Sequence, residues 1–327
     1  MRSPLLLSGL LLLSSALQAN AAEQPALAAE VKALWQANDY AAAETLLAPL
    51  VTKKTKDAQL LALLGRTQAG LQNMQRAEEL LEKAIKYDAN NADYQHWYAT
   101  ASCNLAGSAG MFSALGYAKR CKKAYETALK LAPQNPRSYV ALGSFLAQAP
   151  GIAGGDRDGA LKMVAQLKQL DQLQGELLQL RVSDLADDAS FKRLLAETEL
   201  LSTRPELYFQ RAMQFAHVEN YRDAISALQQ ALSQPAADDD AVASQAESRY
   251  QLGRIAVLSK TAVAEGIAAM QQYLAQTPDK ARIDWANLRL AQLHLLADDK
   301  AKADAILQPL LAATTDDKLK AELKKLL

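Results

Sequence analysis

The sequence predicts an all-α solenoid of about seven to eight helical hairpins, and three observations support this prediction. Apolar residues make up 50% of the 327 residues but aromatic residues only 6%. The core must therefore consist mostly of Ala and Leu, which favour closely packed helices over sheets. Glycine and proline are few, 14 and 10, which leaves room for many short helices. Apolar stripes at helical spacing also recur with a period of about 34 residues.

The clearest copy of this repeat covers residues 57–91. Leu61 and Gly65 mark the buried stripe of its first helix, and Ala77 and Leu81 that of its second. Helix axes approach closely only where side chains are small. We therefore expect Gly65 to face Ala77, with leucines filling the layers around them.

The other copies follow in chain order. A first copy covers residues 27–55, where Pro49 is expected to kink or shorten the second helix. A third and a fourth begin near residues 92 and 139, and the fifth, residues 174–204, is degenerate. Three more follow from residue 205, and residues 316–327 are expected to form an amphipathic helix that covers the end of the stack.

Two copies are longer than the period, and their extra residues are centred on 105–114 and 149–158. The first insertion is expected to be a Gly/Ser/Ala-rich loop. In the second, the two glycines allow positive φ and the following Asp can cap a helix. Equivalent turns of neighbouring repeats lie side by side, so the two loops are expected to touch and to form an insertion edge for a partner. The candidate residues of this insertion edge are Met111, Phe112, Pro150, Gly154, Gly155 and Asp156. The alternative is that the second insertion is only a long capped turn.

The degenerate fifth copy indicates a boundary between two blocks. The N-terminal block covers residues 22–172 and carries both insertions, and the C-terminal block covers residues 173–327 with the final helix.

Residues 1–21 have the pattern of a secretory signal peptide. Arg2 supplies a short positive region, residues 5–17 are apolar, and residues 19–21 form an A-x-A cleavage site. The apolar run is short for a retained span of about 20 residues. We expect export to the periplasm, cleavage before Ala22, and no stable membrane span in the mature chain.

The charge balance disfavours two classes of partner. Thirty-six basic and 36 acidic residues cancel, so no strong net field attracts nucleic acid or an anionic membrane. We expect no nucleic-acid partner.

The small-residue positions resemble those of the tetratricopeptide repeat (TPR) family. The matching residues are Gly65/Ala77/Ala84, Gly143/Ala160, Ala212/Tyr221/Ala224/Ala231 and Ala291/Ala303, with Pro133, Pro205 and Pro278 closing copies. The stretch Ala149–Asp156, A-P-G-I-x-G-G-D, further resembles a group of bacterial exported TPR proteins. The resemblance implies a right-handed TPR superhelix that binds proteins or peptides in the groove lined by its first helices.

The first helices of copies two to four supply the candidate residues of this groove. They are Arg66, His96, Thr100, Asn104, Arg137, Ser144 and Gln148. Two arginines can hold a peptide carboxylate in bidentate fashion, although the clamp residues of some TPR domains do not map onto them one for one. An ordinary hydrated face is the alternative. The C-terminal copies offer a more apolar face, suited to a helix or apolar segment of a partner: Phe209, Met213, Tyr250, Arg254, Trp285 and Leu288.

Cys103 and Cys121 are the only cysteines, and they flank the first insertion. In an exported chain, oxidising conditions favour a disulfide between two thiols on neighbouring helices. The alternative is that both are small packing residues. A basic cluster beside them on the chain, Lys119, Arg120, Lys122 and Lys123, reads as a solvated outer face or as a surface for an acidic partner.

The sequence gives no sign of catalysis, a metal or a cofactor. The three histidines, His96, His217 and His294, lie far apart without metal-binding spacing. The Asp pairs at 187–188, 238–239, 298–299 and 316–317 suit helix starts. The chain is therefore interpreted as a non-enzymatic adaptor. The alternatives are a small-ligand or cell-wall-fragment binding protein with Arg66, His96 and Arg137 as an anion pocket, or an accessory subunit of an envelope enzyme complex.

Overall fold

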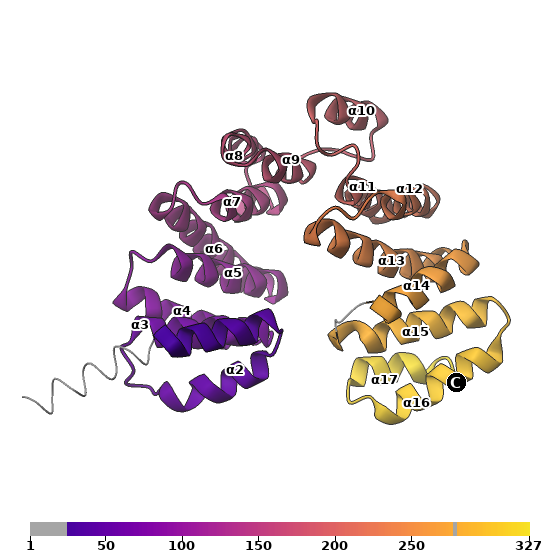
Figure 1. Ribbon diagram of the computed structural model, residues 1–327, viewed down its shortest axis with the longest axis horizontal. Helices are drawn as coiled ribbons and strands as arrows, with labels where there is room; N and C mark the ends of the chain where they lie inside the picture. Colours follow the sequence, from indigo (N-terminus) through magenta and orange to yellow (C-terminus); the bar gives the residue numbers. More distant parts are fainter. Residues whose placement is uncertain (1–24, 277–279) are drawn as a thin grey trace, which may run out of the picture. The chain divides into compact units, whose positions relative to one another are not determined.

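The computed structural model describes residues 25–276 and 280–327, which form helices joined by turns (Figure 1). No strand occurs within these two ranges, so the prediction of an all-α fold is confirmed. The expected signal peptide, residues 1–21, and Pro278 lie outside the described residues.

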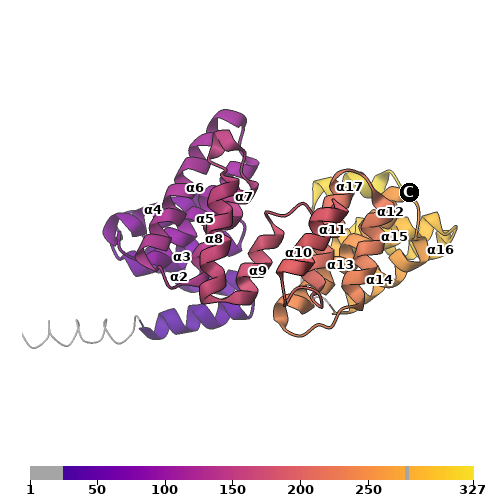
Figure 2. The ribbon, with the colours of Figure 1, turned by 90° about the horizontal axis from the view of Figure 1, so that it is seen from above.

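The chain divides into two compact units, unit 1 up to Met163 and unit 2 from Val164 on. This division falls inside α8, whereas the sequence predicts it just after that helix, between residues 172 and 173. Within each unit, hairpins are layered one on the next (Figure 2).

Unit 1 is built from the first four hairpins. They are residues 25–36 with α2 (Tyr40–Leu47), α3 (Ala58–Gly70) with α4 (Met74–Tyr87), α5 (Ala92–Ser108) with α6 (Met111–Leu131), and α7 (Pro136–Gln148) with the start of α8 (Arg157–Leu170). Pro49 lies in the short 3₁₀ helix η1 (Ala48–Leu50), so α2 ends before it, as predicted.

Unit 2 is also built from helix pairs. Its hairpins are α9 (Gln172–Leu180) with α10 (Asp188–Glu197), α11 (Pro205–His217) with α12 (Tyr221–Ser233), α13 (Asp239–Ser259) with α14 (Val263–Gln276), and α15 (Lys280–Leu296) with α16 (Lys300–Ala313). The degenerate copy gives the short pair α9 and α10. The final helix α17 (Asp317–Lys324) buries Leu319 and Leu323 against α15 and α16, so the predicted covering helix is confirmed.

The predicted close approach of the two helices in a hairpin is confirmed at Gly65. A Cβ atom there would lie 2.7 Å from Cγ of Leu81 and 3.4 Å from the carbonyl oxygen of Ala77. Leu61 and Leu81 are fully buried around this contact. Each such leucine stabilises the fold by about 1.5–3 kcal/mol relative to an exposed one.

Five of the described hairpin turns share one backbone conformation. Non-glycine residues with φ between 51° and 62° lie there: Asn38, Gln72, Glu219, Lys260, Ala262 and Asp298. In four of these turns the next residue donates its N–H to the carbonyl five residues earlier, as in a Schellman motif. These bonds join Asp39 to Leu34, Asn73 to Gln68, Asn220 to Phe215 and Asp299 to His294, at 2.9 Å each.

The Asp pairs stand at helix starts, as predicted. Asp187, Asp238, Asp299 and Asp316 each accept a backbone N–H in the first turn of the helix that follows. They satisfy amide groups that the helix itself leaves without a partner.

The prediction of a loop at residues 105–114 is wrong. These residues extend both helices of the hairpin, so α5 has 17 residues and α6 has 21, and the turn is only Ala109–Gly110. Leu105, Ala106 and Leu115 are good helix formers, and their propensity offsets the cost of about 1 kcal/mol for Gly107 inside a helix.

The second insertion is a turn that contains the 3₁₀ helix η2 (Gly151–Ala153). Gly154 has a φ of 102°, and a Cβ at Gly155 would overlap the carbonyl of Ala149. The Asp156 carboxylate accepts the Gly159 N–H at 3.0 Å and caps α8, which begins at the next residue. The expected roles of the two glycines and of Asp156 are confirmed.

Candidate functional site

Four side chains from successive first helices of unit 1 form a column, here called the Trp–Arg stack. They are Trp35, Arg66 on α3, Trp97 on α5 and Arg137 on α7. The guanidinium carbon of Arg66 lies 4.0 Å from the ring centre of Trp35 and 4.5 Å from that of Trp97. The guanidinium carbon of Arg137 lies 4.8 Å from the Trp97 ring. The order is therefore ring, cation, ring, cation.

The repeat itself explains this column. Trp35, Arg66 and Trp97 are 31 residues apart, three fewer than the 34 that separate the N-caps Asp57 and Asn91. Each therefore lies about one turn earlier in its first helix than the residue before it, and stacking of the hairpins brings these turns side by side. Arg137 comes later along the chain because the lengthened α5–α6 hairpin separates it from Trp97.

The Trp35 and Trp97 rings each contact a further side chain that fixes their position. The indole N–H of Trp35 donates to the buried Thr67 hydroxyl at 3.0 Å, and Trp35 itself is buried. The Trp97 ring meets the edge of His96, with 5.8 Å between ring centres. The tryptophans thus cover faces of the guanidinium groups, so that hydrogen bonds to a ligand would form at the N–H edges.

The stack carries positive charge with little local compensation. In the part of the chain that the structure describes, Arg66 has no carboxylate within ion-pair distance, and Arg137 has only the exposed Asp93 at 3.8 Å. Burial lowers the pKa of both arginines, and the charge of Arg137 lowers the pKa of Arg66 further. An anion placed between them would relieve this repulsion.

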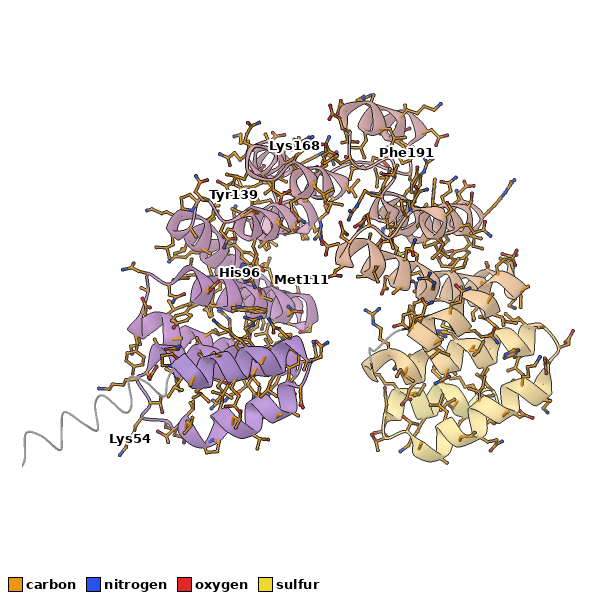
Figure 3. The ribbon with its side chains drawn as sticks, viewed as in Figure 1. Lys54, His96, Met111, Tyr139, Lys168 and Phe191 are labelled. Carbon is orange, nitrogen blue, oxygen red and sulfur yellow. A yellow bond between two sulfur atoms is a disulfide. The ribbon has the colours of Figure 1, made fainter. Side chains whose placement is uncertain are left out.

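His96 lies next to the stack as a neutral group. Burial, with the charges of Arg137 and Arg66, lowers its pKa to about 4. Its Nδ1 is buried and has no hydrogen-bond partner among the described residues. The ring packs against Tyr125 at 5.4 Å, and the Tyr125 hydroxyl lies 3.1 Å from that of Thr100. Figure 3 labels His96 near the start of α5.

The structure brings together Arg66, His96, Thr100 and Arg137 from the predicted groove residues. The other three take no part in the stack. Asn104 and Ser144 bond to carbonyls of their own helices, those of Thr100 at 2.9 Å and Val140 at 2.6 Å, and Gln148 is exposed at the end of α7.

Sequence reasoning missed Trp35, Trp97 and Tyr125. The signal for the two tryptophans was weak, because they lie 31 residues before and after Arg66 and not one 34-residue period away. A comparison of first helices shifted by one helical turn is needed to find them.

The insertion edge differs from the prediction. Met111 and Phe112 are 79% and 93% exposed in the first turn of α6. The second insertion contacts α6 beside Lys122, where a Cβ at Gly154 would lie 3.1 Å from the lysine chain. That point is about three helical turns from Met111, so the insertions meet along α6 and not tip to tip.

The disulfide between Cys103 and Cys121 is present, with 5.2 Å between their Cα atoms. It joins α5 to α6 below the lengthened tip. On the other side of α6, Arg120 donates to Glu78 of α4 at 2.9 Å, so one member of the basic cluster is used inside the fold.

The predicted C-terminal face is only partly available. Phe209 and Met213 pack against the core of α11–α14, Tyr250 packs on Tyr273, and Trp285 packs on the last hairpin. Arg254 is exposed. Including Leu288 was wrong, because it is fully buried on the side of α15 that faces α16 and α17.

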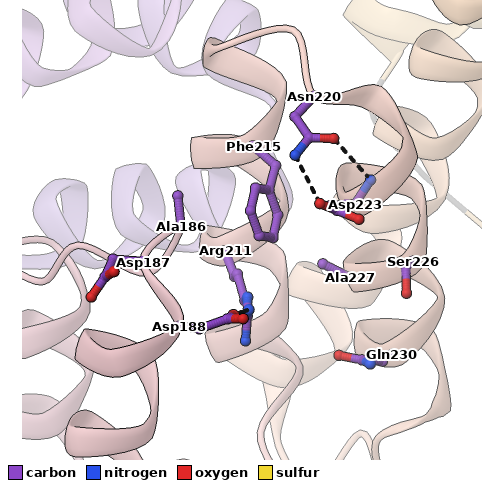
Figure 4. Close-up of a pocket in the computed structure, with 10 residues that line it drawn as sticks. All are labelled: Ala186, Asp187, Asp188, Arg211, Phe215, Asn220, Asp223, Ser226, Ala227 and Gln230. Atoms are coloured by element: carbon purple, nitrogen blue, oxygen red, sulfur yellow. Dashed lines mark hydrogen bonds and ion pairs between the residues drawn. The ribbon is translucent and has the colours of Figure 1, made fainter.

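Unit 2 holds a cavity of about 560 Å³ that sequence reasoning did not find (Figure 4). Arg211 lies in its wall, 3.8 Å from the ring centre of Phe191 and 5.3 Å from that of Phe215. It also forms an ion pair with Asp188. The remaining lining residues are Ala186, Asp187, Asn220, Asp223, Ser226, Ala227 and Gln230.

Two further observations limit the chemistry. No helix among the described residues is both long and apolar enough to cross a membrane. Within the same residues, no group of three His, Cys, Asp or Glu side chains is placed to hold a metal ion.

Comparisons with known proteins agree with the fold. Two family models, both described as tetratricopeptide repeat, match residues 34–103 and residues 103–135. No curated protein matches the chain.

Solved structures extend the likeness beyond the matched residues. Yeast Tom70 is 16% identical with a TM-score of 0.60, covering 88% of this chain and 58% of that one. The Cut9–Hcn1 hetero-tetramer of the APC/C is 15% identical at 0.46, covering 90% and 47%. A tetratricopeptide repeat protein of Parabacteroides merdae is 13% identical at 0.44, covering 92% and 97%. The chain spans about half the length of the first two.

At these identities the likeness to Tom70 concerns the fold alone. Residues 34–135 match the tetratricopeptide repeat, and the helical hairpins outside them have the fold of a tetratricopeptide repeat solenoid.

Proposed function

We propose that the protein is an exported, non-catalytic adaptor that binds a partner protein or peptide through an acidic group held on the Trp–Arg stack. One observation carries the proposal: Arg66 and Arg137 are positioned by Trp97, yet Arg66 has no ion pair within the described residues. Proteins of this family generally bind proteins or peptides and act as scaffolds.

A carboxylate is the ligand group that suits this arrangement. A guanidinium donates two parallel N–H bonds to a carboxylate in one plane, and that edge stays open when the face lies on an aromatic ring. Stacking also fixes the side chain before the ligand arrives, so less conformational entropy is lost on binding. Two such cations, on α3 and α7 with Trp97 of α5 between them, suit two carboxylates, or one carboxylate and a backbone carbonyl.

Export is supported by the leader pattern of residues 1–21 and by the disulfide between Cys103 and Cys121. Disulfides persist in oxidising compartments such as the bacterial periplasm. The periplasm is therefore the proposed location.

The absence of catalysis is proposed from the separation of the histidines. His96 is packed between aromatic rings, His217 is exposed at the end of α11, and His294 is buried on α15. Each lies in a different hairpin, and such scaffolds generally have no catalytic activity.

The first test is photo-crosslinking in cells from a probe at Asn104, which is exposed on α5 within one turn of Thr100. The wild-type chain is compared with Arg66→Ala/Arg137→Ala and with Arg254→Ala, an exposed arginine of unit 2. We expect one dominant protein crosslink that the double variant loses and the control keeps.

Binding by purified protein defines the chemistry. A pool of random hexapeptides is titrated in two forms, with a free C-terminal carboxylate and with an amide, and Trp fluorescence is recorded. We expect the free-carboxylate pool to bind at least about tenfold more tightly, since a bidentate charged pair is worth about 1.5–3 kcal/mol.

The outcomes separate the alternatives. Crosslinks that survive in the double variant would contradict the proposal. No protein crosslink, together with tight binding of small carboxylates, would favour a small-ligand binding protein. Co-purification at fixed stoichiometry that is insensitive to both arginines would favour an accessory subunit.

A further inference from the structure

The two insertions carry the most exposed large apolar side chains among the described residues. Phe112 is 93% exposed, and Met111 and Ile152 are each 79% exposed, whereas the next value is 66% for Val218. Phe112 and Met111 begin α6, and Ile152 lies in η2, which contacts α6. All three therefore lie on or beside one helix of unit 1.

The tip of the α5–α6 hairpin projects beyond its neighbours. Its helices have 17 and 21 residues, against 13 and 14 for both the α3–α4 and α7–α8 pairs. A Cβ atom at Gly107 or Gly110 would meet no atom within 4 Å. Met111 is labelled at this end of α6 in Figure 3. The apolar pair is thus at a bare, protruding end and not in a groove.

This hairpin is basic although the whole chain is neutral. Residues 92–131 contain five basic and two acidic side chains, and no acidic residue lies between Asp93 and Glu126. With His96 neutral, the local net charge is +3. The overall balance of 36 against 36 hides this asymmetry.

The exposed charges line up with the apolar tip. At 100° per residue, Phe112, Lys119, Lys123 and Lys130 lie within about 40° of one another around α6. All four are exposed, and Glu126 is the one acidic residue on that stripe. Lys122 lies beside the stripe, against the second insertion.

We propose that this surface, the α6 stripe with Met111 and Ile152, binds the interface of an anionic phospholipid bilayer. Phe and Met side chains enter the boundary between headgroups and acyl chains, and lysines behind them contact lipid phosphates. Lysine chains can lie along the interface with their ammonium groups among the headgroups.

A bilayer fits these observations better than an acidic protein does. A protein partner must supply a pocket complementary to a protruding phenyl ring, and hot-spot residues usually stand at the centre of a packed patch. A bilayer accepts an isolated protruding ring without a complementary shape. The cationic stripe then supplies the second signal that stable interfacial binding needs.

The experiment is vesicle flotation with the chain that starts at Ala22, so that the apolar leader cannot bind lipid. Vesicles are made of phosphatidylcholine alone, or of phosphatidylcholine and phosphatidylglycerol in equal parts. We expect binding to the anionic vesicles only. Met111→Ser/Phe112→Ser and Lys119→Gln/Lys123→Gln are each expected to weaken it roughly tenfold or more.

Matched controls come from unit 2. Val218→Ser removes another exposed apolar side chain, and Lys300→Gln/Lys318→Gln removes two exposed lysines. Both controls are expected to bind like the wild type. Because all substituted side chains are exposed, the fold should persist, which circular dichroism checks.

Equal binding to neutral and anionic vesicles would overturn the proposal. So would unchanged binding by the Met111→Ser/Phe112→Ser variant. Crosslinks from position 112 to an acidic protein, with no vesicle binding, would assign the surface to a protein partner instead. The peptide tests of the Trp–Arg stack are independent of all these outcomes.

Discussion

The arginine that lies nearest to an aromatic ring differs in its ion pairs between the two units. In unit 1, Arg66 has no ion pair among the described residues, and Arg137 approaches only the exposed Asp93. In unit 2, Arg211 lies on Phe191 and is paired with Asp188. The buried Arg204 of unit 2 is paired with both Glu206 and Asp238.

This difference separates recognition from stability. A guanidinium with a carboxylate partner inside the fold has its donors occupied and contributes to holding helices together. A guanidinium that has only aromatic rings beside it keeps its donors for a ligand, at some cost to the stability of the unit. We therefore expect different substitutions and different pH ranges to lower the free energy of unfolding of each unit.

The largest expected loss of stability follows from removal of the disulfide in unit 1. Replacing Cys103 and Cys121 by Ser should lower the free energy of unfolding of unit 1 by about 3 kcal/mol, because the bridge closes a loop of 18 residues. Trp285→Phe leaves only Trp35 and Trp97, so fluorescence then reports on unit 1. A reductant should have no further effect on the double Ser variant, and a loss of unit 2 stability would contradict this expectation.

In unit 2 the corresponding weak point is Arg204. Arg204→Met keeps the bulk but leaves the mostly covered Glu206 carboxylate without its partner, so stability should fall by about 2–3 kcal/mol. This loss is at the low end of the range for a broken buried ion pair, because Asp238 is half-exposed. Denaturation followed through Trp285 measures it, and Arg222→Met, an exposed control, should change little. Equal stability of both variants would remove the contrast between the units.

Between pH 6.5 and 4, acid should destabilise unit 1 more than unit 2, because burial lowers the pKa of His96 further than that of His294. The pKa of His96 is about 4 in the folded chain and near 6.5 when unfolded. The unfolded state therefore binds the proton first, and stability present above pH 6.5 is lost as the pH falls towards 4. We expect unit 1 to lose about 2 kcal/mol by pH 5.

In unit 2, burial lowers the pKa of His294, so this unit also loses some stability below pH 6.5. A carboxylate of the same unit titrates in a lower range. Hydrogen bonds, first from Arg204 and then from the Ala241 amide, hold the pKa of Asp238 at about 2. Its stabilisation is present above the ordinary value of 3.8 and is lost below it. His96→Gln should flatten the response of unit 1 between pH 6.5 and 4, whereas His217→Gln should leave it unchanged. Simultaneous unfolding of both units would argue against separate titrations.

The smallest effect concerns the stack itself. Trp97→Leu removes the ring that both Arg66 and Arg137 contact, which should weaken binding of free-carboxylate peptides about tenfold through two lost cation–π contacts. Trp285→Leu removes the ring near Arg289 in unit 2 and should have no effect on this binding. If Trp97→Leu bound these peptides as tightly as the wild type does, stacking on Trp97 would not be what positions the two arginines for binding.

The repeat period allowed much of the fold to be predicted. Gly65, Leu61 and Leu81 follow a pattern that one helix pair must bury, and the structure places them so. The first insertion could not be assigned in this way. Gly107 and Gly110 suggested a loop, but neighbouring Leu and Ala residues extended the helices.

The candidate site was predicted in part for a similar reason. Charged and polar residues on first helices were noticed, so Arg66, His96 and Arg137 were found. Trp35 and Trp97 were not predicted as site residues, because an aromatic residue in a helical stripe usually belongs to the core. Their role depends on contacts between residues 31 apart in sequence, which only the stacking of hairpins brings together.

The left-handed turn residues mark the repeat in the backbone where side chains do not. Asn38, Gln72, Glu219, Lys260 and Asp298 share no common side-chain chemistry, yet all have nearly the same φ. Each conformation costs about 1 kcal/mol that a glycine would not pay. The chain thus retains a reserve of stability at its hairpin turns, which glycine substitutions could recover one repeat at a time without touching either charged surface.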